Sequence, residues 1–293
     1  MSPPKSLLML MVVLCGVEGS VLQDPDLLRA YSAIRSLQVL GDGANTTGQA
    51  RPPMLVILGT QSSGKTSFVE SIVGWAVGYT HRATATKCPV RYVLRSGATN
   101  FYRVGVQVVE DRESLRRAVR KHMESLSNDI TSDVLVVEIQ EPGMFDLDVT
   151  DMPGMKDRGE SDYWQIANIT KAFLRDPRTL PVVMCQASKS HETQHDLDVL
   201  RDLGLSFSKA LVIMNYMNKQ IPDMAKVSQL NAYIKGQRGK FPNARFVMLH
   251  YEDSIDKEGM SSGELEQYYQ RLPQKEQASF KAHLQRMTQD EAG

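Results

Sequence analysis

A glycine-rich segment directly after a run of five apolar residues constrains this chain more than any other feature. The apolar run, Met54 to Leu58, is typical of a strand buried on both faces. Gly59 to Thr66 has the sequence Gly-Thr-Gln-Ser-Ser-Gly-Lys-Thr, which matches a phosphate-binding loop in full. Thr66 to Gly74 then has helical spacing. Strand, loop and helix follow in the order that a phosphate site at a helix N-terminus requires.

The chemistry of such a loop assigns roles to its residues. Its glycines let backbone N–H groups turn toward a β-phosphate, and the helix that follows adds the positive end of its dipole. Lys65 is predicted to bridge the β- and γ-phosphates, and the Thr66 hydroxyl to bind Mg²⁺. The predicted nucleotide-binding residues here are Gly59, Gln61, Ser62, Ser63, Gly64, Lys65, Thr66 and Ser67. An unrelated glycine- and serine-rich turn is the alternative, which the flanking strand and helix disfavour.

Two further segments are candidates for the same site. Asp151-Met152-Pro153-Gly154 ends a second apolar run, where Asp151 can hold Mg²⁺ through a water and the Gly154 N–H can bond a γ-phosphate. Thr86 lies in a polar loop between the two motifs, where a threonine can reach the ion and sense the γ-phosphate. The predicted metal ligands are Thr66, Thr86 and Asp151. The structural alternatives are a common strand-to-turn ending for the first segment and a turn residue for Thr86.

Strand and helix patterns alternate along the rest of the chain. Strands are predicted at 54–58, 90–94, 104–109, 134–139, 145–150, 181–185, 211–214 and 246–249, and helices at 66–74, 114–126, 163–174, 194–203 and 225–235. This alternation predicts the α/β class. We expect the three-layer fold of P-loop NTPases, with a mixed, mostly parallel sheet and helices on both faces.

The chain divides into four predicted segments. Residues 1–20 are a candidate signal peptide, because Lys5 precedes an apolar run of eleven residues, Leu7 to Val17, which is short for a membrane-spanning helix. Residues 24–53 are expected to form an N-terminal amphipathic helix and a polar linker. The main domain is predicted at 54–260, followed by a C-terminal helical segment at 261–293.

Charge and cysteine content exclude some classes of protein. The 34 basic residues balance 34 acidic ones, so we expect no nucleic-acid partner. Three cysteines exclude a disulfide scaffold and favour a reduced, intracellular protein. We therefore expect a cytoplasmic protein, with membrane association left open. The secretory pathway is the alternative if residues 1–20 act as a signal.

Three motifs together resemble one family. Gln61 to Ser67, Thr86-Lys87-Cys88-Pro89 and Asp151 to Gly154 are similar to motifs of the dynamin superfamily of large GTPases, including its Mx-like branch. The resemblance covers about residues 27–284, which is one G domain with its flanking helices. It implies a GTPase that hydrolyses GTP to GDP and phosphate with Mg²⁺.

The resemblance also implies residue roles. Gln61 and Ser62 would organise the attacking water and a monovalent cation, K⁺ or Na⁺. Thr86 would be the switch threonine and Gly154 the γ-phosphate sensor. The implied catalytic residues are Gln61, Ser62, Lys65 and Thr86.

Family members pair their G domains across the nucleotide, which predicts a G-domain homodimer here. They also carry a long helical stalk, which we expect this chain to lack. The apolar stripes at 27–40 and 265–287 would then leave a groove for a helical partner or a second copy.

The chain departs from the family at the base-specificity motif, Asn/Thr-Lys-x-Asp. Asn215-Tyr216-Met217-Asn218-Lys219 stands in its place. If Asn215 opens the motif, Tyr216 replaces the lysine and Asn218 the aspartate. If Asn218 opens it, Ile221 replaces the aspartate. The predicted base-side residues are Asn215, Asn218 and Lys219.

This departure is expected to weaken guanine selectivity. Guanine offers two N–H donors to the aspartate, whereas an asparagine presents one acceptor and one donor group. A xanthine-like edge suits Asn218 better, and Asp223 is the alternative carboxylate if the loop is rebuilt. The switch region departs as well, since His81-Arg82-Ala83 replaces the usual Gly-Ser-Gly run.

Three functions remain open from the sequence. The first is an active GTPase. The second is a catalytically impaired nucleotide-binding module of the same fold, acting through protein binding with altered base specificity. The third is a secreted binding protein, which depends on residues 1–20 alone.

Overall fold

A computed structural model describes residues 54–79, 86–126, 130–144, 146–176, 178–188, 201, 203–205, 210–241, 244–246 and 260–292. The candidate signal peptide, the helix and linker predicted at 24–53, and the switch residues His81-Arg82-Ala83 lie outside the described residues. So does most of the helix predicted at 194–203.

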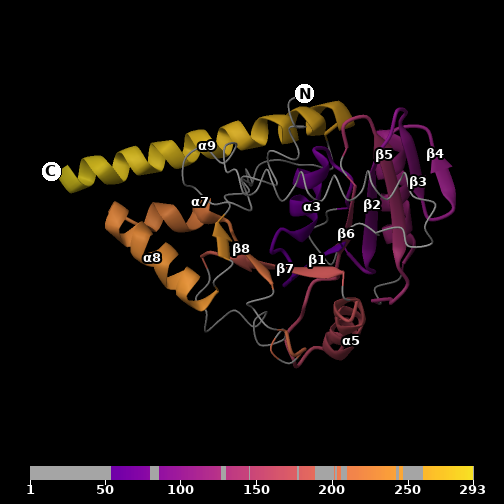
Figure 1. Ribbon diagram of the computed structural model, residues 1–293, viewed down its shortest axis with the longest axis horizontal. Coiled ribbons are helices and arrows are strands. Elements are labelled where there is room, and N and C mark those ends of the chain that lie inside the picture. Colours follow the sequence, from indigo (N-terminus) through magenta and orange to yellow (C-terminus); the bar gives the residue numbers. More distant parts are fainter. Residues whose placement is uncertain are drawn as a thin grey trace, which may run out of the picture.

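The described strands form one nine-stranded sheet, in the order β4-β3-β5-β2-β6-β1-β7-β8-β9 (Figure 1). Its strands are β1 (Met54–Gly59), β2 (Val90–Ser96), β3 (Phe101–Val104), β4 (Gln107–Val109), β5 (Leu135–Glu141), β6 (Leu147–Asp151), β7 (Thr179–Gln186), β8 (Leu211–Asn215) and β9 (Ala244–Phe246). Pairing is parallel except for β2 with β6 and β3 with β4 and β5. The predicted mixed, mostly parallel sheet is confirmed.

Helices cover both faces of this sheet. They are α3 (Lys65–Val73), α4 (Arg112–Ser125), α5 (Tyr163–Leu174), α7 (Met217–Gln220), the 3₁₀ helix η4 (Ile221–Asp223), α8 (Val227–Lys240) and α9 (Ser262–Ala292). Alternate side chains of β1 enter two separate cores: Ile57 packs in the core that contains α3 and α4, and Leu58 in the core that contains α5 and α8. This layering places the carboxyl end of β1 between helices, as a phosphate site requires.

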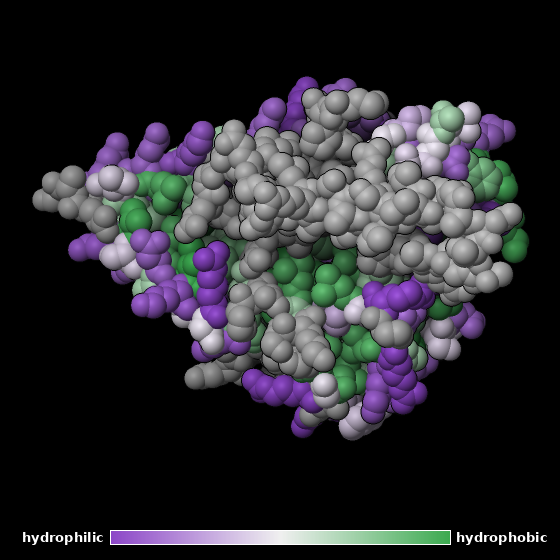
Figure 2. Space-filling view, in the orientation of Figure 1, coloured by the Kyte–Doolittle hydropathy of each residue, from purple (hydrophilic) through white to green (hydrophobic). Residues whose placement is uncertain are grey.

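The C-terminal helix α9 links the two cores. Leu265 and Leu272 in its first half are buried in the α3 core, whereas Met287 is buried in the α8 core. Figure 1 shows α9 running along one side of the molecule. In Figure 2, apolar side chains lie between α9 and α8, and hydrophilic side chains lie outside this zone. Within the described residues, no helix combines the length and apolar character that crossing a bilayer requires.

One predicted strand was wrong. The segment 104–109 is not a single strand: it contains the last residue of β3, a turn at residues 105–106 and the strand β4, and Val104 pairs with Gln107. Gly105 reverses the chain with φ +59°, a left-handed conformation that suits glycine. Val106 and Val108 are 99% and 62% exposed at the sheet edge. The pattern could not distinguish an edge hairpin from a buried strand.

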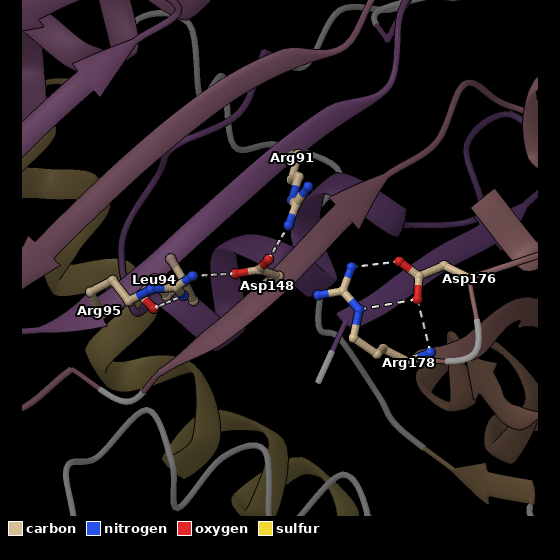
Figure 3. Close-up of polar contacts among 6 residues, drawn as sticks. All are labelled: Arg91, Leu94, Arg95, Asp148, Asp176 and Arg178. Carbon is tan, nitrogen blue, oxygen red and sulfur yellow. Dashed lines mark hydrogen bonds and ion pairs between the residues drawn. The ribbon is translucent and has the colours of Figure 1, made fainter. Parts of the chain in front are cut away.

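An ion-pair cluster joins β2 to β6. The carboxylate of Asp148, which is 1% exposed, accepts a hydrogen bond from Arg91 and lies 2.8 Å from Nη2 of Arg95. Antiparallel pairing sets Asp148 opposite Val93, so the two arginines flank it diagonally on the same strand. Figure 3 shows Asp148 between them, with the pair Arg178–Asp176 beside the cluster. A buried acid is thus neutralised at the strand junction.

Candidate functional site

The phosphate-binding loop lies at the carboxyl end of β1. Gly59, Ser62 and Gly64 have φ values of +149°, +61° and +92°. A Cβ on Gly59 would lie 2.6 Å from the carbonyl oxygen of Met184, and one on Gly64 would lie 2.4 Å from Nδ2 of Asn215. Both glycines are therefore required by close packing as well as by backbone conformation.

Lys65 is held against this loop. The residue is 6% exposed, and its ammonium donates to the carbonyl oxygens of Thr60 at 2.8 Å and Gly59 at 3.2 Å. Its charge is therefore fixed next to the backbone that is predicted to surround the phosphates.

The predicted metal ligands come together. The Thr66 hydroxyl donates to Oδ2 of Asp151 at 2.6 Å, and Oδ1 of Asp151 is buried without a hydrogen-bond partner among the described residues. Thr66, Thr86 and Asp151 line a small cavity of about 10 Å³. A buried, unsatisfied carboxylate oxygen beside two hydroxyls suits a hard cation such as Mg²⁺, which prefers oxygen ligands.

The electrostatics of Asp151 agree with that fit. Burial raises the pKa of its carboxyl to about 6, although the charge of Lys65 and the hydrogen bond from Thr66 act in the opposite direction. The buried carboxylate of Glu70 contributes to the rise. A cation at this position would offset the cost of burying the ionised carboxylate.

The Asp151–Gly154 segment packs directly on the phosphate-binding loop. The backbone N–H of Met155 donates to the carbonyl of Gly59 at 3.0 Å, and Met155 forms an isolated parallel bridge with Thr60. A Cβ on Gly154 would lie 2.9 Å from Cα of Gln61. The predicted γ-phosphate sensor and the predicted water-organising glutamine are therefore neighbours, and only glycine permits that approach.

On the other side of the loop, Asn215 fixes the end of β8. Its Nδ2 donates to the carbonyl of Ser63 at 2.9 Å, and its Oδ1 accepts from the N–H of Tyr216 at 2.7 Å. Tyr216 has φ +60° and donates its hydroxyl hydrogen to the carbonyl of Ser62 at 3.1 Å. The second proposed register puts Ile221 opposite the base, but Ile221 is 1% exposed in the core. The geometry thus favours the register in which Asn215 opens the motif.

The remaining predicted residues differ in their surroundings. Asn218 and Lys219 lie on α7, where Oδ1 of Asn218 is buried without a partner among the described residues and Nζ of Lys219 lies 5.3 Å from the ring centroid of Tyr216. Ser67 is 5% exposed in the first turn of α3. Asp223 is exposed on η4.

Sequence reasoning missed two groups at the site. Nε2 of Gln186, the last residue of β7, donates to the carbonyl of Ser62 at 3.4 Å. A polar residue at the carboxyl end of a predicted parallel strand was a usable signal. Glu70, 1% exposed in α3, accepts from the Gly78 N–H at 3.2 Å and from the Tyr269 hydroxyl. Nothing in the sequence pointed to that contact, because it joins α3 to α9.

Comparison with known proteins agrees with this geometry. The family model described as "Dynamin family" matches residues 55–217. The chain is similar to the Interferon-induced GTP-binding protein Mx of Siniperca chuatsi, with 23% identity over 55% of this chain and 28% of that protein. It is similar to the corresponding Mx protein of Larimichthys crocea, with 24% identity over 59% of this chain and 29% of that protein. For the Dynamin-1-like protein of Mus musculus the identity is 22% over 61% of this chain and 28% of that protein.

The chain thus spans less than a third of the length of these relatives. The family match covers more than half of the chain and includes the phosphate-binding loop, Thr86 and Asp151. On this evidence the chain belongs to the dynamin family.

Proposed function

We propose that this chain binds GTP together with Mg²⁺ and hydrolyses it to GDP and phosphate. The observation that carries the proposal is the hydrogen bond from the Thr66 hydroxyl to Oδ2 of Asp151, 2.6 Å long, next to a complete phosphate-binding loop. The names of the Mx relatives describe GTP-binding proteins, which supports the choice of nucleotide.

The chain's own residues would divide the work as follows. Backbone N–H groups of the loop and the ammonium of Lys65 would bind the β- and γ-phosphates. Thr66, Thr86 and Asp151 would hold Mg²⁺, which when bound neutralises charge on the phosphate oxygens. Gln61 and the Gly154 N–H, which adjoin each other, would position the attacking water and the γ-phosphate.

Further parts of the proposal depend on the family resemblance. Gln61 and Ser62, both exposed at the loop, would also serve a monovalent cation, K⁺ or Na⁺. Two copies of the chain would pair through their G domains across the nucleotide, and the protein would act in the cytoplasm. The competing function is nucleotide binding without turnover, which the replaced residues Tyr216 and Asn218 favour.

A comparison of two lysine variants tests the proposal. Saturating Mg²⁺ and GTP should raise the melting temperature of the full chain by about 5–10 °C, as expected at about a hundredfold excess over Kd. Lys65→Ala should abolish this rise and also phosphate release. Lys235→Ala, on the exposed side of α8, is the matched control and should leave both intact.

The outcomes are distinct. Stabilisation without phosphate release above the Lys65→Ala background supports the binding module without turnover. A response to Mg²⁺ and GTP that is equal in the wild type and in Lys65→Ala contradicts the proposed site.

A further inference from the structure

The phosphate-binding loop has two sides that the sheet order keeps apart. β1 lies between β6, which carries Asp151, and β7, which pairs with β8. Thr66 contacts Asp151 on the β6 side, whereas Ser62 and Ser63 are contacted from the β7–β8 side. Ligands of parallel α/β sheets lie along the carboxyl ends of the strands. A triphosphate with its metal at Asp151 therefore extends its nucleoside toward the end of β8.

At and just after the end of β8, Asn215 and Tyr216 use their side chains to hydrogen-bond backbone groups, whereas Asn218 on α7 differs. Asn215 is fully buried and uses both amide atoms, one for the Ser63 carbonyl and one for the Tyr216 N–H. The hydroxyl hydrogen of Tyr216 is directed to the Ser62 carbonyl. By contrast, Oδ1 of Asn218 is buried and has no hydrogen-bond partner among the described residues. This oxygen can therefore accept a hydrogen bond from a ligand.

The position of Asn218 is fixed by its neighbours. Met217 and Ile221, which are 3% and 1% exposed, anchor the α7–η4 turn in the core, and the N–H of Lys219 closes the turn on the carbonyl of Tyr216 at 2.9 Å. Because this turn is anchored in the core, the Asn218 side chain cannot shift freely to suit different ligands. It can therefore discriminate between them.

The amide chemistry of Asn218 determines which base edge fits. Its Oδ1 can accept from the N1–H that every 6-oxopurine carries, and its NH₂ group then faces position 2 of the ring. Guanine has an amino group there, so two donors meet. Hypoxanthine has only a hydrogen, and xanthine has a carbonyl that accepts from the amide. A carboxylate would instead accept both donors of guanine.

We propose that Asn218 reads the base and that the site binds 6-oxopurine nucleoside triphosphates without favouring the 2-amino group. GTP enters this site, but inosine and xanthosine triphosphates bind at least as well. This inference rests on the proposed function and specifies its substrate class.

Competition binding on the full chain tests it. GTP, ITP, XTP and ATP compete with a fluorescent GTP analogue in the presence of Mg²⁺. For the wild type, the Kd values for ITP and GTP should agree within about threefold, and XTP should bind about tenfold more tightly than GTP. In Asn218→Asp, GTP should bind about tenfold or more tightly than XTP, since a charged acceptor replaces the amide. Asn231→Asp, on the exposed side of α8, adds the same charge and should keep the wild-type order.

The wild-type ratios test the inference even if Asn218→Asp fails to fold. A wild type that prefers GTP over both ITP and XTP by about tenfold overturns it and leaves the proposed function standing. An order that is unchanged in a folded Asn218→Asp also overturns it. If no triphosphate binds the wild type, the proposed function itself fails.

Discussion

The hydroxyl of Thr66 lies 2.6 Å from Oδ2 of Asp151, although the two residues are 85 positions apart in the chain. Thr66 belongs to the first turn of α3, and Asp151 is the last residue of β6. Parallel pairing of β1 with β6 sets Ile57 beside Asp151, so both carboxyl ends reach the same edge of the sheet. The predicted metal site therefore forms because β1 and β6 are parallel neighbours in the sheet.

Replacing Asp151 by Asn should stabilise the metal-free protein at pH 8 and abolish its response to Mg²⁺. Burial raises the pKa of Asp151 from 3.8 to about 6, so the fold favours the protonated carboxyl. The stabilising contribution of that form is complete below about pH 4 and is lost as the pH rises through 6. At pH 8 the ionised group costs up to about 3 kcal/mol, which the amide avoids.

Urea unfolding with EDTA at pH 4 and pH 8 measures this difference. The variant should gain free energy of unfolding relative to the wild type mainly at pH 8. Equal pH dependence in the two proteins would contradict the role of Asp151 as a buried acid.

Gly64→Ala should destabilise the protein more than Gly105→Ala. Both glycines have positive φ, so both substitutions carry a backbone penalty of about 1 kcal/mol. Only at Gly64 does the added Cβ also meet another residue, Nδ2 of Asn215 at 2.4 Å, whereas nothing lies within 4 Å at Gly105. Urea unfolding should therefore rank the variants, and only Gly64→Ala should lose stabilisation by nucleotide. Equal losses in the two variants would show that backbone strain alone matters.

Asp148→Asn should destabilise the β2–β6 junction. It leaves Arg91 and Arg95 without their buried partner (Figure 3). Since both arginine side chains are about one-third exposed and can turn to solvent, we expect a loss of about 1–3 kcal/mol, less than for a fully buried pair. Asp176→Asn, which removes the partner of Arg178 at the surface, is the control and should have a much smaller effect. Similar unfolding midpoints for the two variants would refute this ranking.

Tyr269→Phe should weaken the attachment of α9 to α3. The Tyr269 hydroxyl donates to Glu70, and the two residues are 3% and 1% exposed, so its loss removes a donor from a buried carboxylate at about 1–3 kcal/mol. A double-mutant cycle with Glu70→Gln should give a coupling of about 0.5–3 kcal/mol. Amide exchange in the first half of α9 should accelerate in Tyr269→Phe. Strictly additive losses would mean that the two side chains do not act on each other.

Much of the sheet could be predicted because β1, β7 and β8 contain runs of consecutive apolar residues, and because β2 carries apolar side chains between its polar ones. β1, β2, β7 and β8 were all located within a few residues of their observed bounds. The edge hairpin β3–β4 was not, because Val106 and Val108 alternate as core residues do and yet face solvent. An edge strand pairs with a neighbour on one side alone, so its apolar side chains need not be buried.

The phosphate-binding loop could be identified from the sequence, since the glycine and lysine spacing between a strand and a helix is a local property. The sequence also supplied Thr66, Thr86 and Asp151 as predicted metal ligands. The register of the base motif, by contrast, depends on tertiary contacts: the hydrogen bonds of Asn215 and Tyr216 to the loop and the burial of Ile221. The tertiary structure alone showed the contact of Glu70 with Tyr269. Such contacts depend on which strands and helices lie side by side, and residue spacing along the chain does not record that.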